Sequence, residues 1–213
     1  MSRFTILLGG ELKPTPRLAE QIAGSRVIAA DAGMRHAAAL GVTPELWVGD
    51  FDSVPDDLPR RLLDVERRAF SPDKNKTDGE LAIETALAQG ATSLLLAGAF
   101  GGPRLDHAFL HLTIAVKLRE TGAPVMLSSG AQEGVPLGPE LDFDYRDGVV
   151  FSIIAFDDLS GLTVTGARWP LDAFSMSFGS SRTISNEVQG RLRVKLQRGR
   201  AMLVAHPYPA AGF

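Results

Sequence analysis

The sequence predicts an α/β protein: an N-terminal three-layer α/β/α domain with a mostly parallel sheet, followed by a C-terminal antiparallel β-sandwich. Two observations support this. Up to about residue 127, short apolar β-prone runs alternate with helical patterns, which is typical of parallel sheets. From Ser128 onward there is no convincing helical period, and β-like runs are separated by turn signals. Because Ser128–Gly138 is rich in Gly, Ser and Pro, we expect domains at 1–130 and 131–213.

Six apolar runs predict the strands of the first domain: Phe4–Leu8, Val27–Ala30, Leu46–Val48, Ala69–Ser71, Ser93–Ala97 and Pro124–Leu127. The intervening segments predict helices at Arg17–Ala23, Met34–Leu40, Asp56–Arg68, Thr77–Gln89 and from Leu105 to Gly122. The fourth helix has the clearest signals. Thr77 and Glu80 have the spacing of a capping box, and Gly90 stands where a C-terminal glycine belongs.

The second domain is predicted from β-like runs at Val149–Ala155, Leu162–Val164, Phe174–Phe178, Arg191–Leu196 and Ala201–Ala205. Turn signals at Asp147-Gly148, Ser160-Gly161 and Arg198-Gly199 separate them.

Composition narrows the function classes. The net charge of −3 offers no basic surface for nucleic acid. No cysteine is present, which excludes disulfides and thiolate metal sites. The apolar run at the N-terminus is too short for a signal peptide or a membrane span. We therefore expect a cytoplasmic protein that binds small molecules, with no membrane partner.

Five aspartates fall at predicted strand-to-helix junctions: Asp31, Asp50, Asp52, Asp78 and Asp106. The carboxyl ends of parallel strands form the edge where such sheets bind ligands. Asp50 and Asp52 are two residues apart, so in extended backbone both would point to one side of the sheet and share a cation. Mg²⁺ prefers carboxylate, water and phosphate oxygens. Carboxylates gathered at one edge would repel each other unless a cation bridged them.

Each feature also has an ordinary structural explanation. Asp and Ser are common in turns, and an aspartate in the first turn of a helix is stabilised by the helix dipole. The glycine-rich turns Gly9-Gly10 and Gly98–Gly102, together with the nearby cations Arg104, Lys74 and Lys76, make the set as a whole a candidate phosphate site. Neither GxxxxGK[ST] nor GxGxxG is present, so the site is not a P-loop or a Rossmann fingerprint.

Four motifs, in this order and before a β-rich tail, resemble the thiamine pyrophosphokinase family. They are ADAG (30–33), GDFDS (49–53), DKNKTD (73–78) and GGPRLDH (101–107). The tail adds the run from Thr183 to Asn186 and the closing GRAMLV.

The resemblance implies an ATP-binding α/β domain, a thiamine-binding β-sandwich and a homodimer with thiamine between subunits. It also implies transfer of pyrophosphate from ATP to thiamine, releasing AMP. On the matching positions, Mg²⁺ ligands would be Asp50, Asp52 and Asp78. Asp31 and Asp106 would serve ATP or metal, and Arg104 and Thr77 would contact phosphate. The same motifs place Gly33, Lys76, Gly101 and Gly102 on the nucleotide side, and Ser185 and Asn186 on the thiamine side.

The chain departs from the family pattern at three points. Pro103 is inserted into the expected GGRxDH, Ala32 replaces a glycine of ADGG, and Met34-Arg35-His36 replaces an expected Asn-Arg pair. Ala32 would be strained if that position required positive φ. Two alternatives therefore stay open: an ATP pyrophosphokinase for another heterocyclic alcohol, and a non-catalytic module that binds nucleotide or thiamine. Trp169 is a candidate for stacking on a ligand or for the sandwich core.

Overall fold

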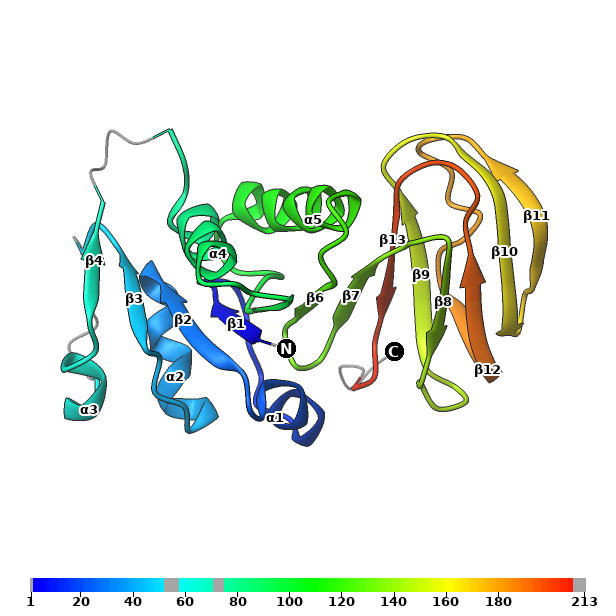
Figure 1. Ribbon diagram of the computed structural model, residues 1–213. Coiled ribbons are helices and arrows are strands. Elements are labelled where there is room, and N and C mark those ends of the chain that lie inside the picture. The colour runs from blue at the N-terminus through cyan, green and yellow to red at the C-terminus, as the bar shows by residue number, and fades with distance from the viewer. Residues whose placement is uncertain (1, 52–57, 71–74, 209–213) are drawn as a thin grey trace. The chain divides into compact units, whose positions relative to one another are not determined.

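The computed structural model describes residues 2–51, 58–70 and 75–208 (Figure 1). The chain divides into two compact units, 1–112 with 123–130 and 113–122 with 131–213. The first holds a parallel sheet and its helices, and the second holds antiparallel strands. The predicted fold class is confirmed.

The sheet of the first unit has the strand order β6-β5-β1-β2-β3-β4, and every pair in it is parallel. Its strands are β1 (Arg3–Leu7), β2 (Arg26–Ala30), β3 (Leu46–Gly49), β4 (Arg67–Ala69), β5 (Ser93–Ala97) and β6 (Val125–Ser128). Its helical elements are α1 (Pro16–Ile22), η1 (Asp31–Met34), α2 (Arg35–Leu40), α3 (Arg60–Leu63), α4 (Asp78–Ala88) and the first part of α5 (Leu105–Glu120).

Helices cover both faces of this sheet (Figure 1). On one face, Leu18 and Ile22 of α1 and Ala37 of α2 pack with Leu7 and Trp47 from the strands. Helix α4 packs against β1, β2 and β3. Because alternate strand residues face opposite sides, the strand cores are apolar on both faces, as expected for a covered parallel sheet.

One predicted helix is wrong. The surface helix expected over Asp56–Arg68 is only α3 in the described part, and β4 begins at Arg67, two residues before the predicted strand. The Arg67 guanidinium lies 4.9 Å from the Trp47 ring centroid, and the Trp47 amide donates to the Glu66 carbonyl. The charged sequence before Ala69 suggests a surface helix, but its last residues pair with β3 instead. This pairing gives their backbone groups hydrogen-bond partners, which the end of an exposed helix would lack.

The second unit contains β7 (Glu133–Pro136), β8 (Glu140–Phe143), β9 (Val150–Ala155), β10 (Leu159–Ala167), β11 (Leu171–Met176), β12 (Asn186–Lys195) and β13 (Ala201–Ala205). One group of strands pairs in the order β8-β12-β10-β11, and the start of β12 pairs with β9, which continues through β13 to β7. Strand β12 therefore joins two antiparallel layers, and Phe151, Leu162 and Leu192 are completely buried in the core they share.

Strands β7 and β8 have no counterpart in the sequence prediction. They contain Gly134, Pro136 and three acidic residues, a composition that does not indicate strands. Long-range pairing produces them: β7 pairs with β13, and β8 pairs with β12.

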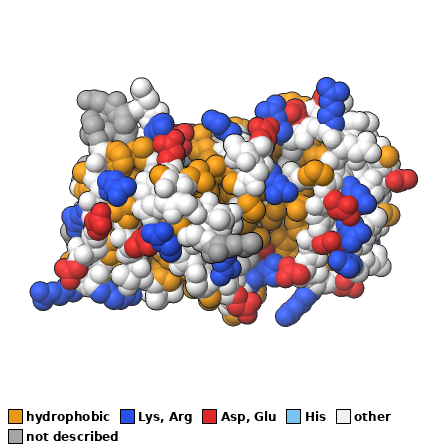
Figure 2. All heavy atoms as spheres, viewed as in Figure 1, with side chains coloured by type: hydrophobic (Ala, Val, Ile, Leu, Met, Phe, Trp, Pro, Cys, Tyr) orange, Lys and Arg blue, Asp and Glu red, His pale blue; other side chains and the backbone are white. Residues whose placement is uncertain are grey.

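Acidic and basic side chains are interspersed on the face drawn in Figure 2, as the near-neutral composition predicts. Among the described residues, no helix is long and apolar enough to cross a bilayer.

Candidate active site

A pocket of about 240 Å³ lies at the carboxyl edge of the parallel sheet in the first unit. It is bordered by the residues after β1, by η1, by the start of α4, and by the loop and first turns that follow β5. We call it the edge pocket. Its polar side chains include Asp31, Thr77, Asp78 and Arg104, four of the residues that the sequence predicted.

Asp31 occupies a backbone conformation that non-glycine residues rarely adopt, with φ of 43°. Its carbonyl accepts a hydrogen bond of 2.9 Å from the indole Nε1 of Trp47. The chain also packs closely here, because a methyl group added at Gly49 on β3 would lie 3.4 Å from the Asp31 Cα. The strain at Asp31 is thus held by its neighbours, which is the pattern found at functional sites. Ala32 does not have positive φ, so its replacement of glycine costs nothing there.

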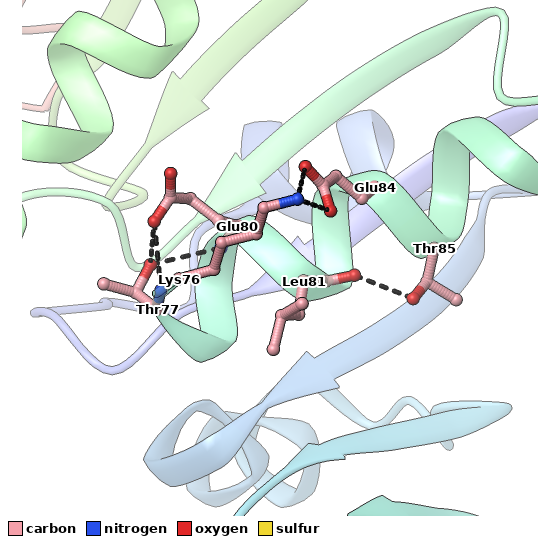
Figure 3. Close-up of polar contacts among 6 residues, drawn as sticks. All are labelled: Lys76, Thr77, Glu80, Leu81, Glu84 and Thr85. Atoms are coloured by element: carbon pink, nitrogen blue, oxygen red, sulfur yellow. Dashed lines mark hydrogen bonds and ion pairs between the residues drawn. The ribbon is translucent and has the colours of Figure 1, made fainter. Parts of the chain in front are cut away.

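The start of α4 borders the pocket with Thr77 and Asp78. Figure 3 shows Thr77 beside its capping partner Glu80. The capping box is confirmed: Thr77 Oγ1 accepts from the Glu80 amide at 3.3 Å, and Glu80 Oε2 accepts from the Thr77 amide at 3.0 Å. Because both ends of this box are satisfied, the first turn is fixed. Asp78 is therefore held on a rigid helix end, where the dipole favours its negative charge.

Lys76 is engaged elsewhere. Its Nζ donates to both carboxylate oxygens of Glu84 at 2.7 Å, along the side of α4 (Figure 3). Lys76 does not border the edge pocket. A phosphate contact by Lys76 would require this exposed ion pair to open, which costs little.

Arg104 borders the pocket while forming a two-pronged ion pair with Asp106. Arg104 Nε lies 3.0 Å from Oδ1, and Nη2 lies 2.7 Å from Oδ2. The hydrogen bonds from Arg104 are the main cause that holds the pKa of Asp106 well below its usual range. Both groups stay charged throughout the neutral range. Asp106 itself does not line the pocket, so its contact with the site is through Arg104.

The glycine-rich turns Gly9-Gly10 and Gly98–Gly102 are hydrogen-bonded to each other at the pocket wall. The Gly10 amide donates to the Gly98 carbonyl at 2.9 Å, and the Glu11 amide donates to the Phe100 carbonyl at 2.7 Å. A methyl group on Gly10 would lie 2.5 Å from both acceptor oxygens, so only glycine permits this approach. Gly101 borders the pocket, whereas the Gly102 amide points to Glu11 Oε1 at 3.4 Å.

Gly33 is buried and serves the packing of η1 on β1 instead of lining the pocket. A methyl group there would meet the Leu7 carbonyl oxygen at 2.1 Å. Its absent side chain therefore sets how closely η1, and with it Asp31, lies over the end of the central strand.

Asp50 follows β3 but is not part of the pocket lining. The residue after it, Phe51, has φ of 60°, so the backbone at Phe51 is not extended, which was the condition for Asp50 and Asp52 to point to one side of the sheet. A residue in the left-handed region breaks the side-to-side alternation that an extended strand would give. Asp52 itself, like Lys74, lies outside the described residues.

Within residues 2–51, 58–70 and 75–208, no three His, Cys, Asp or Glu side chains gather closely enough to enclose a metal ion. The predicted trio of Asp50, Asp52 and Asp78 includes a residue outside these ranges, so it stays a prediction. Mg²⁺ commonly uses one or two carboxylates with water and phosphate oxygens, so it does not need such an enclosure.

The structure adds three ionisable side chains to the pocket lining that the sequence analysis did not assign to the site: Arg35, His107 and His111. Arg35 Nη2 donates to the Gly10 carbonyl at 3.1 Å. His111 is 7% exposed, and its Nδ1 donates to the Ala99 carbonyl at 3.1 Å. For the two histidines, the sequence did contain a signal: His107 and His111 are four residues apart and therefore share one face of α5.

Burial is the main cause that lowers the pKa of His111 below the ordinary value of 6.5. The folded state therefore binds fewer protons at this site than the unfolded chain, and stability should fall as pH drops below about 6.5. We expect His111→Asn, which keeps a donor for Ala99, to lose less stability than the wild type between pH 7.5 and 5.5. Thermal unfolding at both pH values measures this. An equal loss in both proteins would contradict it.

The second unit has a pocket of about 250 Å³, here called the sandwich pocket. Trp169, Ser185 and Asn186 are among its lining residues, with Phe151 and Ile153 of β9 at its apolar wall. Trp169 is 54% exposed, so it is not a residue of the sandwich core. Ser185 has φ of 58° and its amide donates to Ser152 Oγ at 3.0 Å. The two residues predicted for the thiamine side are thus brought to one pocket.

Comparison with known proteins accounts for both units. A family model described as "Thiamin pyrophosphokinase, catalytic domain" matches residues 21–127, and one described as "Thiamin pyrophosphokinase, vitamin B1 binding domain" matches residues 140–201. The chain is 28% identical to the thiamine pyrophosphokinase of Bacillus subtilis over 170 residues, covering 76% of this chain and 77% of that protein.

Solved structures agree. The crystal structure of thiamine pyrophosphokinase from Bacillus subtilis superposes with a TM-score of 0.83 at 25% identity, covering 96% of this chain and 99% of that one. The enzyme from Geobacillus thermodenitrificans gives a TM-score of 0.79 at 26% identity, with 100% and 99% coverage. The two family models together account for the catalytic and the vitamin-binding parts of such enzymes. This chain belongs to the thiamin pyrophosphokinase family.

Proposed function

We propose that the edge pocket holds ATP for pyrophosphoryl transfer and that the sandwich pocket holds thiamine. The family's reaction moves the pyrophosphoryl group of ATP to the hydroxyl of thiamine, giving thiamine diphosphate and AMP. One observation carries the assignment of the edge pocket. Asp31, Thr77, Asp78 and Arg104 come from three separate segments, yet all border one cavity at the carboxyl edge of the sheet. In this proposal, residues 1–130 form the ATP domain and residues 131–213 the thiamine domain.

The acidic side chains of the edge pocket fit a hard divalent cation. Asp31 and Asp78 both border the cavity, and Asp50 follows the neighbouring strand β3. Carboxylate oxygens are the donors that Mg²⁺ prefers, completed by water and phosphate oxygens. Asp50 and Asp78, with Asp52, would hold the ion, and Asp31 would support ATP or the same ion. When bound, Mg²⁺ would supply positive charge against the phosphate oxygens.

The protein's own groups bind and orient the phosphate chain. The fixed first turn of α4 offers the Thr77 hydroxyl, and the wall at Gly101 lets backbone approach closely. The Arg104 guanidinium is planar and has five N–H donors. Its Nε and Nη2 bind Asp106, which orients the group, and its remaining donors are available for phosphate oxygens. This arrangement favours electrostatic stabilisation of the transferring group.

In this proposal the bond changes are those of the family's reaction. The thiamine hydroxyl oxygen attacks the β-phosphorus in line with the bond to the α-phosphate, and that bond breaks. Its electron pair remains on the α-phosphate oxygen of AMP, and the hydroxyl proton passes to a pocket aspartate. Arg104 faces the charge that develops on the phosphate oxygens during this transfer.

On the acceptor side, the sandwich pocket offers an apolar wall, the half-exposed Trp169 ring and Ser185. An aromatic ring at a pocket rim suits a flat heterocycle that carries positive charge, such as the thiazolium of thiamine. Ser185 is held with positive φ and would present its hydroxyl to the same ligand.

We further propose a homodimer in the cytoplasm. Exposed apolar side chains support an interface between copies: Leu105 and Phe109 on α5 are 81% and 59% exposed, and Phe178 is 66% exposed. Light scattering after gel filtration tests this, with a mass near twice 22.8 kDa expected and a single-chain mass contradicting it.

The reaction is tested by measuring AMP release from ATP and Mg²⁺, with and without thiamine, while following thiamine diphosphate as product. Thiamine-dependent AMP with an equal amount of diphosphate supports the proposal. ATP binding without thiamine-dependent turnover would move the acceptor to another heterocyclic alcohol, which a screen of such alcohols for AMP release would find. Binding of both ligands without any AMP would indicate a non-catalytic module.

A further inference from the structure

Asn186, the first residue of β12, uses its side chain inside the protein. Its Oδ1 accepts from the Trp169 amide at 3.1 Å and from the Glu187 amide at 2.9 Å. Its Nδ2 donates to the Trp169 carbonyl at 2.9 Å. The residue is 8% exposed. The carboxamide therefore hydrogen-bonds both the N–H and the C=O of Trp169, as the backbone of a neighbouring strand would.

These hydrogen bonds hold a residue that strand pairing does not hold. Trp169 lies in the link between β10 and β11, outside both strands. Next to it, the Arg168 amide donates to the Glu187 carbonyl at 2.9 Å, and the Arg168 guanidinium lies 4.8 Å from the Trp169 ring centroid. Because Trp169 is 54% exposed, core packing alone does not hold its ring. Two of the three hydrogen bonds of Asn186, one from the Trp169 amide and one to the Trp169 carbonyl, fix the backbone from which the ring extends.

We infer that Asn186 is a positioning residue, which acts on the thiamine site by fixing Trp169 at the rim of the sandwich pocket instead of by bonding the ligand. The inference rests on the proposed function, because it assigns a task within the thiamine site. Both Asn186 Oδ1 bonds and the Nδ2 bond to Trp169 are internal, so the side chain has little capacity left for a ligand.

A double-mutant cycle separates positioning from direct contact. We expect Asn186→Ala and Trp169→Ala each to raise the KM for thiamine about tenfold, leaving the KM for ATP unchanged. The double variant should be no worse than Trp169→Ala, because Asn186 has nothing left to position. Effects that multiply in the double variant would mean that Asn186 contacts thiamine itself, and would overturn the inference.

Controls keep the result interpretable. Tyr208→Ala removes a partly exposed aromatic ring of the same unit that does not line the pocket, and should leave both KM values unchanged. Should Asn186→Ala fail to fold, Asn186→Asp keeps the two acceptor bonds and loses only the donor to Trp169, so its KM for thiamine should still rise. A normal KM for thiamine in Asn186→Asp would contradict the inference.

Fluorescence gives a second readout that a merely structural role would not move. The chain has two tryptophans, and Trp47 is 1% exposed, so acrylamide quenches Trp169 selectively. In Asn186→Ala we expect faster local motion of the quenchable tryptophan, seen in its anisotropy decay, with an unchanged Trp47 component. Identical decays in variant and wild type would oppose the inference. A wild type without thiamine-dependent turnover would count against the proposed function instead, since the decay can still be measured.

Discussion

Replacing Asp78 by asparagine is expected to lower kcat for AMP release by about a hundredfold or more. Asp78 borders the edge pocket at the first position of α4, where it would hold Mg²⁺ against the phosphates. The amide keeps the size of the side chain and removes its charge, so the cation loses a ligand that neutral oxygen replaces poorly. Steady-state kinetics across a Mg²⁺ titration measure the effect.

The fold should survive this change. An aspartate in the first turn of a helix contributes about 0.3–1 kcal/mol through the dipole, and the capping box of Thr77 and Glu80 remains. Asp64→Asn is the matched control, because Asp64 is exposed in the same unit and lies outside the pocket. Its kcat should stay at the wild-type value. An Asp78→Asn enzyme with near-normal turnover at low Mg²⁺ would remove Asp78 from the proposed metal site.

Gly33→Ala is expected to destabilise the protein by about 3 kcal/mol or more, at or beyond the upper range for overpacked positions. The added methyl group would lie 2.1 Å from the Leu7 carbonyl oxygen and 2.9 Å from the Leu8 amide nitrogen. Both belong to the backbone at the end of β1, which is paired on both sides by β2 and β5 and cannot move away. For a chain of this size the midpoint of thermal unfolding should drop by roughly 6–12 °C.

Gly9→Ala provides the contrast within the same region. Its added methyl group would lie 3.5 Å from Ala32 Cβ, an ordinary contact, so the unfolding midpoint should change little. Neither glycine has positive φ, so an alanine adds no backbone strain at either position. The difference between the two unfolding midpoints, measured by calorimetry, therefore reports the steric cost of the added methyl group. Equal midpoints for the two variants would show that η1 can shift on β1, and that Gly33 does not set the position of Asp31.

Strained backbone occurs in both pockets. In the described ranges, four non-glycine residues have positive φ: Asp31, Phe51, Ala173 and Ser185. Asp31 borders the edge pocket and Ser185 the sandwich pocket. Such conformations each cost about 1–3 kcal/mol and persist only where the surroundings impose them. Their presence in the two pockets is consistent with groups held ready for a ligand.

Local sequence signals were enough to predict the class of fold and the sheet edge where the candidate site lies. Buried strands such as Ser93–Ala97 and the helix that starts at Asp78 have local signals that tertiary contacts reinforce: continuous apolar runs and a capping box. Asp31, Asp78 and Arg104 could be assigned to one edge because strand ends of a parallel sheet converge there. Family resemblance then supplied the chemistry.

The hydrogen-bond partners of the side chains predicted for the two sites became apparent only from the folded chain. Lys76 pairs with Glu84, Asp106 pairs with Arg104, and Asn186 binds the backbone of Trp169. In the last case, the partners are 17 positions apart in the chain. Strands β7 and β8 likewise arise from long-range pairing with β13 and β12. Local sequence reports propensity and spacing, whereas partner choice depends on which groups folding brings within hydrogen-bond distance.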